Sequence, residues 1–262
     1  MGLYRREVAY MQVKTYLISN DVDYRELILE DGFINKIYMI NNPEKEIYAI
    51  PDACFDIQFV YENSTFIPYV CGTHTQVSRA FISDSRKIFA VKFEPGVVPD
   101  FIKEYACELV CARKNISQIS ELKNIALKFE LNMEFETMAD IFLKNFVYNT
   151  YFKGKNSVTV KIAEIILQDK GCVSISGIAG QIGYNQRYLD RVFKNSLGVS
   201  MKKYAGIIRI QKAIYYLQNN LTYEIYDRLG YYDQAHFIKD FKKNTSLTPN
   251  QFGRINSKLS IV

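Results

Sequence analysis

The chain has 262 residues, 48% of them hydrophobic and 23% charged, a composition typical of folded proteins rather than disordered or fibrous ones. No run approaches the roughly 20 apolar residues that a membrane span needs, and the first residues lack the apolar stretch of a signal peptide. We therefore expect a cytoplasmic protein without a membrane partner. Its net charge of +5 is unevenly distributed, because residues 157–262 carry 15 Lys/Arg against 7 Asp/Glu. A basic C-terminal part favours a polyanionic partner.

The first hundred residues have the pattern of strands separated by turns. Residues 55–61 alternate apolar and polar at period two, and residues 66–70 and 88–93 also have strand character. Asn63-Ser64 and Glu94-Pro95-Gly96 are turn signals. These features predict a β-rich domain.

From Pro99 onward the apolar residues follow helical spacing, first over residues 101–106 and again over residues 135–146. The periodicity breaks down over residues 150–156. We therefore expect an α+β protein with a β-rich domain and trailing helices over residues 1–150, and a linker over residues 151–157. An all-α domain should follow over residues 158–256, with two helix-turn-helix units joined by a long helix.

The C-terminal part contains an internal near-repeat, residues 178–194 and residues 225–242. Each copy has a short helix, a glycine (Gly183 or Gly230), a polar capping residue (Asn185 or Asp233) and a second helix. A helix-turn-helix unit needs such a turn, in which glycine adopts positive φ and the polar residue caps the next helix. The apolar pairs Leu189–Phe193 and Phe237–Phe241, each four residues apart, should hold the second helices to the core.

The opposite faces of these second helices should then be exposed. Arginine can bond guanine bidentately and glutamine can do the same for adenine, whereas lysines later on each helix suit phosphate. The candidate DNA-binding residues are Gln186, Arg187, Asp190, Arg191 and Lys194 in the first unit and Gln234, Ala235, His236, Lys239, Lys242 and Lys243 in the second. Residues 200–217 predict one long helix, capped by Ser200, that would hold the two units about 34 Å apart for successive major grooves.

At this point the residues resemble the AraC/XylS family of transcription regulators, over roughly residues 158–254. The matching features are Ala179, Gly183, Leu189, Arg191-Val-Phe193-Lys194, Gly198-Val-Ser200, Tyr204, Arg209, Ala213, Leu217, Ile225, Gly230, Asp233, His236-Phe237, Phe241-Lys242-Lys243 and Thr248-Pro249-Asn-Gln-Phe252. The resemblance implies double-stranded DNA as partner. It places base reading at Arg187, Asp190 and Arg191 and at Gln234, Ala235 and Lys239, and it makes Arg209 structural. Departures are Tyr226, Tyr231, Asn185 in place of a common serine, and Ala235, which offers no polar group.

The N-terminal part resembles, more loosely, a β-rich domain that often precedes this module. The resemblance rests on residues 51–57, Gly72 and residues 91–96. It implies a sensing or dimerising role, and it leaves a small-molecule effector, a homodimer and contact with RNA polymerase open as partners.

No residue set indicates an enzyme, a cofactor or a metal site. The five scattered cysteines predict no disulfide framework, and Cys107 and Cys111, four apart, make a poor zinc pair. Asp52 and Asp56 are expected at a turn and a strand edge, and His74 on the surface. Two alternatives remain beside a DNA-binding regulator: a related protein that acts through protein contacts alone, and a regulator with an alkyl-transfer or base-repair domain, which would need zinc-spaced cysteines.

Overall fold

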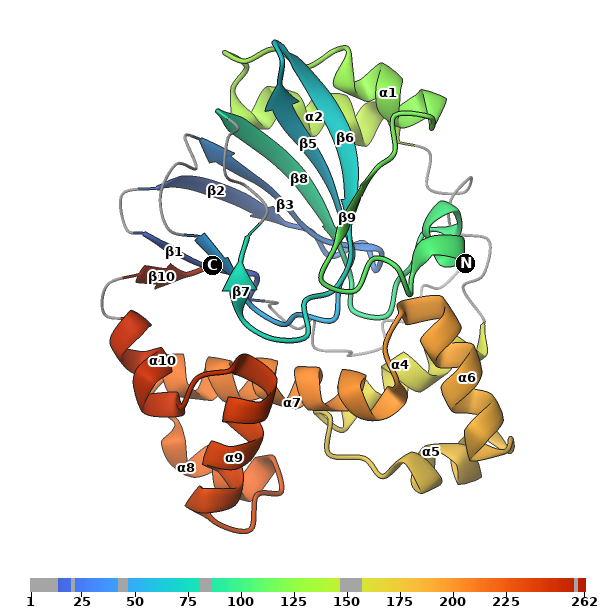
Figure 1. Cartoon of the computed structure of the whole chain (residues 1–262), viewed down its shortest axis with the longest axis vertical. Helices are drawn as coiled ribbons and strands as arrows, with labels where there is room; N and C mark the ends of the chain where they lie inside the picture. Colours follow the sequence, from blue (N-terminus) through green and yellow to red (C-terminus); the bar gives the residue numbers. More distant parts are fainter. Residues whose placement is uncertain (1–13, 20–21, 42–46, 81–85, 147–156, 257–258) are drawn as a thin grey trace, which may run out of the picture.

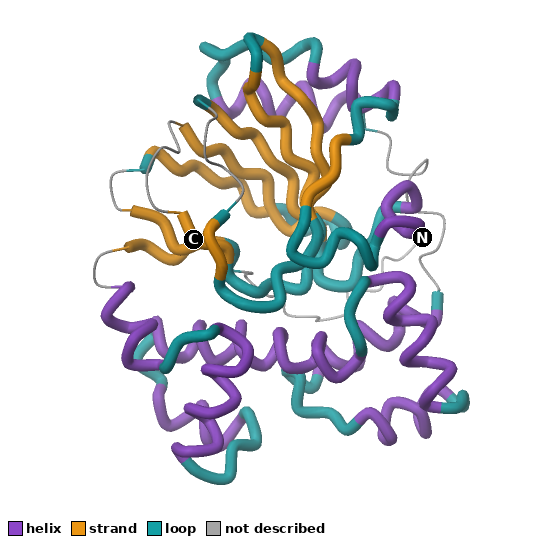
Figure 2. Tube along the Cα trace, in the orientation of Figure 1, coloured by secondary structure: helices purple, strands orange, loops and turns teal. Residues whose placement is uncertain are grey.

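The computed structural model describes residues 14–19, 22–41, 47–80, 86–146, 157–256 and 259–262. A β-rich N-terminal half is followed by a helical C-terminal half, as Figures 1 and 2 show, so the α+β fold predicted from the sequence is confirmed. The expected linker falls almost entirely on residues 151–156, which lie outside the described residues. Among the described helices, none has both the length and the apolar character needed to cross a membrane.

Two antiparallel sheets form the N-terminal half (Figure 1). The larger sheet has the order β2 (Asp23–Ile28), β3 (Ile34–Asn41), β8 (Lys87–Phe93), β5 (Asp56–Glu62), β6 (Thr65–Cys71) and β9 (Arg113–Asn115). The smaller sheet has the order β10 (Leu259–Ile261), β1 (Tyr16–Ser19), β4 (Ile47–Ala49) and β7 (Ser78–Arg79). The three predicted strands are therefore β5, β6 and β8. Asn63 and Ser64 join β5 to β6 with φ values of 49° and 65°, the two-residue turn that suits the strand twist.

Side chains alternate between two cores on either face of the larger sheet. Phe59 and Phe89 point to the helical side, where their rings contact Phe129 and Phe142. Helices α1 (Ser120–Ala126) and α2 (Phe135–Asn145) cover that face (Figure 1). The opposite face, which includes Tyr38, packs on the smaller sheet.

The segment after Pro99, predicted as helical, is the short 3-10 helix η1 (Asp100–Tyr105) rather than an α-helix. Short 3-10 helices of this kind often connect longer elements, and here η1 lies between β8 and β9. The chain then turns at Cys111, whose φ of 53° takes it out of any helix, so Cys107 and Cys111 do not share a helix face.

The C-terminal half is built from helices α4 to α10. Their bounds are α4 Val158–Gln168, α5 Ile175–Ile182, α6 Gln186–Leu197, α7 Met201–Gln218, α8 Thr222–Arg228, α9 Gln234–Thr245 and α10 Pro249–Asn256. Beyond residue 256, where the expected all-α domain ends, the chain does not remain helical. After α10 the chain forms strand β10, which pairs with β1, and the amide nitrogens of Thr15 and Tyr16 donate to the carbonyl of Val262. The open edge of β1 supplies the hydrogen bonds that make this segment a strand.

The two halves share one continuous apolar core, in which residues of α4, α6 and α7 join those of the larger sheet. Polar contacts run along α7 as well. The Gln211 amide donates to the carbonyls of Lys14, at 2.8 Å, and Pro51, at 2.6 Å, and accepts from the Lys14 amide. Nearer the start of α7, the Lys203 ammonium donates to the carbonyl of Thr75 at 2.7 Å. The helix that separates the two helix-turn-helix units is therefore also the helix that the N-terminal half holds.

Candidate nucleic-acid interface

The first helix-turn-helix unit consists of α5, a tight turn and α6. Gly183 ends α5 with a φ of 79°, the left-handed conformation that glycine adopts without steric cost. The Asn185 side chain accepts the Arg187 amide at 2.8 Å and so caps α6, as predicted. Leu189 and Phe193 are buried, and the Phe193 ring contacts Tyr204 of α7 at a centroid distance of 5.1 Å. One face of α6 is therefore fixed to the core.

The outer face of α6 presents the side chains of Gln186, Arg187, Arg191 and Lys194 to solvent. Asp190 differs from these four, because it is half-buried and its carboxylate accepts the Met201 amide at 2.9 Å. This bond gives Asp190 a role in holding the start of α7, next to the cap that Ser200 provides to Lys203.

Two exposed tyrosines, one in the turn before α6 and one in its first turn, were not among the predicted site residues. Tyr184 and Tyr188 stack with their centroids 5.4 Å apart, and the Arg191 guanidinium lies 5.9 Å from the Tyr188 ring. This distance is within the range of about 6 Å over which a cation is attracted to an aromatic ring. The sequence carried a signal for the pair, because Tyr184 and Tyr188 are four residues apart and lie off the Leu189–Phe193 face.

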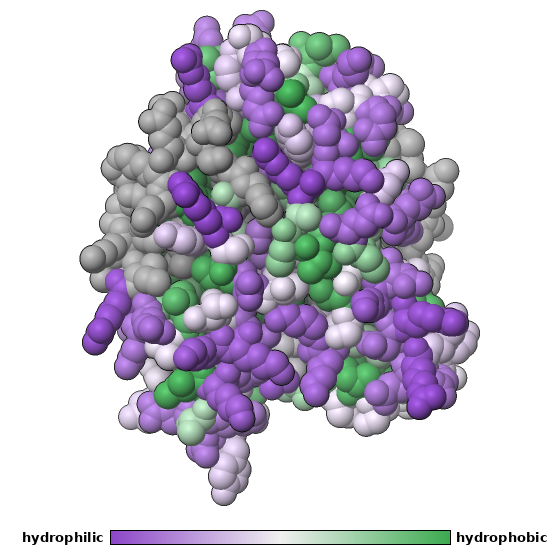
Figure 3. All heavy atoms as spheres, in the orientation of Figure 1, coloured by the Kyte–Doolittle hydropathy of each residue, from purple (hydrophilic) through white to green (hydrophobic). Residues whose placement is uncertain are grey.

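The second unit repeats the arrangement with α8, a turn and α9. Gly230 has a φ of 65°, and the Asp233 carboxylate accepts the His236 amide at 2.7 Å, so the predicted cap is confirmed. Phe237 and Phe241 are buried against the core. The outer face of α9 is exposed at Gln234, Ala235, His236, Lys239, Lys242 and Lys243. Figure 3 shows hydrophilic side chains over the part of the surface where the C-terminal helices lie.

Helix α7 sets the distance between the two units. At 1.5 Å per residue its 18 residues extend over about 27 Å. Helices α6 and α9 lie near its opposite ends (Figure 1). Arg209, half-way along α7, donates to the carbonyl of Gly171 at 2.8 Å and lies 3.9 Å from Asp240 of α9. Arg209 therefore joins the segment before α5 to α9, which agrees with the structural role expected for it.

Comparison with known proteins assigns the family. A helix-turn-helix domain family matches residues 178–255, and a domain of unknown function (DUF6597) matches residues 20–113. PqrA of Proteus vulgaris, a probable transcription factor, is 32% identical over 95 residues, which are 36% of this chain and 78% of that protein. The chain belongs to the AraC/XylS family of transcription regulators. It carries the family's helix-turn-helix DNA-binding domain.

Other matches are shorter or less similar. YtdP of Bacillus subtilis, an uncharacterized HTH-type transcriptional regulator, is 29% identical over 82 residues, and the match spans 30% of this chain and 11% of YtdP. Among solved structures, the C-terminal domain of AraT from Geobacillus stearothermophilus is 27% identical, with a TM-score of 0.36 over 39% of this chain and 88% of that domain. ToxT from Vibrio cholerae is 15% identical, with a TM-score of 0.44 over 92% of this chain and 99% of ToxT.

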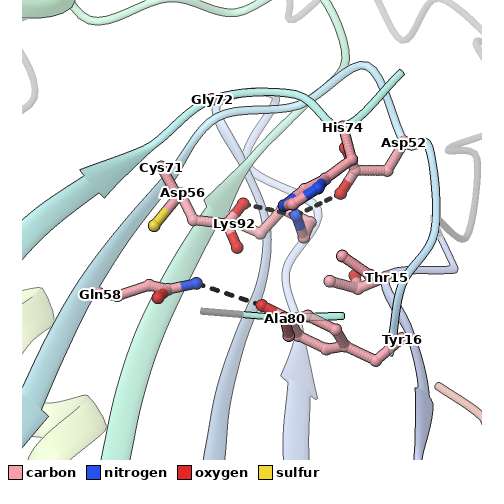
Figure 4. A pocket seen from close by; sticks show the side chains of 11 residues that line it. Thr15, Tyr16, Asp52, Asp56, Gln58, Cys71, Gly72, His74, Ala80 and Lys92 are labelled. Atoms are coloured by element: carbon pink, nitrogen blue, oxygen red, sulfur yellow. Dashed lines mark hydrogen bonds and ion pairs between the residues drawn. The ribbon is translucent and has the colours of Figure 1, made fainter. Parts of the chain in front are cut away.

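The N-terminal half of this regulator contains a buried charge cluster, shown in Figure 4. The Lys92 ammonium donates to Asp52 at 2.6 Å and also to Asp56, and all three residues are buried. Tyr38 donates its hydroxyl to Asp56 at 2.6 Å, and the Gln58 amide donates to the Tyr16 hydroxyl at 3.1 Å. Asp52 has the turn role expected for it, because its carboxylate also accepts the Cys54 amide at 3.2 Å, and Asp56 is the first residue of β5. Their burial and their pairing with Lys92 were not predicted. Both carboxylates are turned inward because they neutralise a lysine in the core.

The electrostatics of this cluster favour a charged Lys92. Burial opposes its charge, but the two carboxylates outweigh burial and raise the pKa of Lys92 well above its ordinary value. Burial raises the pKa of Asp52, and the attraction of Lys92 offsets only part of that effect. His74, expected on the surface, is half-buried beside the cluster, and its ring contacts the Ser78 hydroxyl at 3.0 Å. Burial lowers the pKa of His74, although Asp52 acts in the opposite direction. A cavity of about 20 Å³ within the cluster has room for one water molecule.

Proposed function

We propose that this regulator binds double-stranded DNA sequence-specifically by inserting α6 and α9 into successive major grooves, in response to a signal received by its N-terminal half. The single observation that carries the proposal is the exposure of two cationic helix faces held at either end of one rigid helix. The length of α7, about 27 Å before the radii of α6 and α9 are added, is compatible with grooves about 34 Å apart.

The side chains on these faces are suited to base reading. Arg187 and Arg191 reach solvent from the first half of α6, where a recognition helix meets base edges, and arginine is the commonest partner of guanine. Gln234 and Lys239 hold the corresponding part of α9. Lys242 and Lys243, in the last turn of α9, suit phosphate. The bond from the Met201 amide at the start of α7 explains Asp190 better than base reading does.

Responsiveness is supported by the contacts between the halves. Because Gln211 and Lys203 bond backbone carbonyls of the N-terminal half, a change there is transmitted to the helix that orients both units. A ligand or a second subunit acts only through a difference in affinity for two arrangements of the chain. Within this proposal the partners are DNA, a small-molecule effector, RNA polymerase and a second copy of the chain, in the cytoplasm.

The test uses duplexes selected by the full chain from a random pool, with binding measured by fluorescence anisotropy at several salt concentrations. Arg191→Ala should weaken selected sites by about 1–3 kcal/mol and relax base choice in one half-site. Lys242→Ala should weaken all duplexes alike and reduce the salt slope by about one ion. Lys144→Ala, an exposed lysine of α2 paired with Asp140, is the matched control and should change neither quantity.

Two results would count against the proposal. If Arg191→Ala leaves both affinity and sequence preference unchanged, α6 is not oriented as proposed. If the folded chain selects no duplex even at low salt, the alternative remains, in which a relative of DNA-binding regulators acts through protein contacts alone.

A further inference from the structure

A second and much larger cavity lies where the two halves of the chain meet. Its volume is about 540 Å³, within the range of roughly 300–1,000 Å³ typical of small-molecule sites. The N-terminal half contributes Phe33, which precedes β3, and Val97 and Val98, which follow β8. Helices α4 and α6 form the other walls, and these two helices pack against each other.

Three faces of helix α6 lie in three different environments. Leu189, Phe193 and Leu197 are buried in the core. The face with Arg187, Arg191 and Lys194 is exposed to solvent. A third face, with Tyr188, Val192 and Ser196 four residues apart, lines the cavity. At 100° per residue the cavity face adjoins the arginine face, so an occupant would contact the helix that is proposed to read DNA.

The lining defines the chemistry of the occupant. Phe33, Val97, Val98, Val158, Val160 and Val192 make most of the wall apolar. Three hydroxyl-bearing residues also line the cavity: Thr159 of α4 bonds Ser196 of α6 at 3.2 Å, and Ser157 caps α4. The lining lysine, Lys103, already pairs with Asp100, and Glu164 of the opposite sign lines the same cavity. Burial of a strongly charged molecule is therefore not favoured.

We propose that this cavity is the effector site of the regulator, and that it takes an uncharged, mainly apolar small molecule with a hydrogen-bonding group directed at Ser157, Thr159 and Ser196. The assignment rests on the proposed function, because it names the place at which the signal is received. Bound between Val97 on one side and Val192 on the other, the molecule fixes α4 and α6 relative to the N-terminal half. It thereby changes the presentation of the first recognition helix to DNA.

The test uses Nile red, an uncharged apolar dye with a carbonyl group, whose emission shifts to the blue in apolar surroundings. The full wild-type chain should bind it saturably. Val97→Trp fills the cavity from the N-terminal side and should weaken binding at least tenfold, and Val192→Trp should do the same from α6. Leu127→Trp adds comparable bulk at a position that is 67% exposed and outside the cavity, so this control should bind the dye as wild type does.

A second measurement separates the site from the function. Saturating Nile red should change the affinity of the wild-type chain for its selected duplex at least fivefold, and it should leave the affinity of folded Val97→Trp unchanged. If both tryptophan variants bind dye like wild type, or if bound dye leaves wild-type DNA affinity unchanged, the assignment is overturned. If the chain binds no DNA but both variants still lose dye, the proposed function fails and the binding site stands. If one tryptophan variant does not fold, dye binding by the other variant tests the assignment.

Discussion

Lys92→Met tests the buried charge cluster of the N-terminal half. The side chains of Lys92, Asp52 and Asp56 are only 2%, 5% and 6% exposed, so removing the ammonium leaves two carboxylates that are almost entirely shielded from bulk solvent. Breaking a buried ion pair in this way costs about 3–5 kcal/mol. For a chain of this size that corresponds to a fall in Tm of about 10 °C. Urea unfolding of wild type and variant, followed by circular dichroism at neutral pH, measures the difference.

The pH dependence gives this prediction a definite sign. Burial already raises the pKa of Asp52, so without the opposing effect of Lys92 this carboxylate takes up a proton more readily in the folded chain than in the unfolded chain. The native state then binds more protons, and stability falls as pH rises. The loss caused by Lys92→Met should therefore be smaller at pH 5 than at pH 8.

Two further variants control for the loss of a lysine as such and for the loss of volume. Lys36→Met removes another buried lysine, but its partner Glu26 is 32% exposed and can be hydrated, so the loss should be smaller. Adding Asp52→Asn and Asp56→Asn to Lys92→Met should restore much of the stability. A loss below about 1 kcal/mol for Lys92→Met alone would refute the view that both carboxylates are buried and depend on this cation.

Three other predictions concern the joint between the halves and the second helix-turn-helix unit. Gly198→Ala should lower the free energy of unfolding, measured by urea titration, by more than about 1 kcal/mol, because φ is 78° and the new Cβ would lie 2.3 Å from the carbonyl oxygen of Ala106. The control Gly180→Ala, in open space within α5, should leave this free energy unchanged or raise it. Burial raises the pKa of Glu94 to about 7, so the folded chain binds a proton here that the unfolded chain has already lost. The free energy of unfolding of wild type should therefore fall between pH 5.5 and 8, and that of Glu94→Gln should fall less. Equal slopes of this free energy against pH for the two proteins would contradict the prediction. Asp233→Ala should lower the free energy of unfolding by about 1 kcal/mol and speed amide hydrogen exchange at the start of α9, because the His236 amide loses its acceptor. Unchanged exchange at these amides would show that the cap is dispensable.

The parts of the structure that follow from neighbouring residues could be predicted from the sequence. Gly183 with Asn185 and Gly230 with Asp233 determine where each recognition helix begins, because positive φ and side-chain capping are local effects. The β5–β6 turn follows for the same reason. These local features also sufficed to define the exposed faces of α6 and α9, although contact with DNA there remains a prediction.

The remaining features depend on residues that are distant in sequence. The apolar and polar alternation around Asp56 indicates a strand, but nothing local shows that Lys92, 36 residues later, neutralises it. The bond between Asp190 and the Met201 amide could not be foreseen without the position of α7, and the large cavity depends on both halves being in place. Strand β10 depends most strongly on distant residues. The sequence of this short segment does not predict a strand, and the segment is a strand because it pairs with β1.

The pairing of β10 with β1 also affects how the chain is made. Leu17 and Ile261 are partners about 240 residues apart, so β1 emerges from the ribosome long before its neighbour exists. During synthesis the small sheet has an open edge at β1, and unpaired edges invite strands from other nascent chains. Pairing of β10 with β1 closes a very long loop, which costs conformational entropy. Dilution should accordingly favour correctly folded monomers over dimers in which β1 pairs with a strand of another chain.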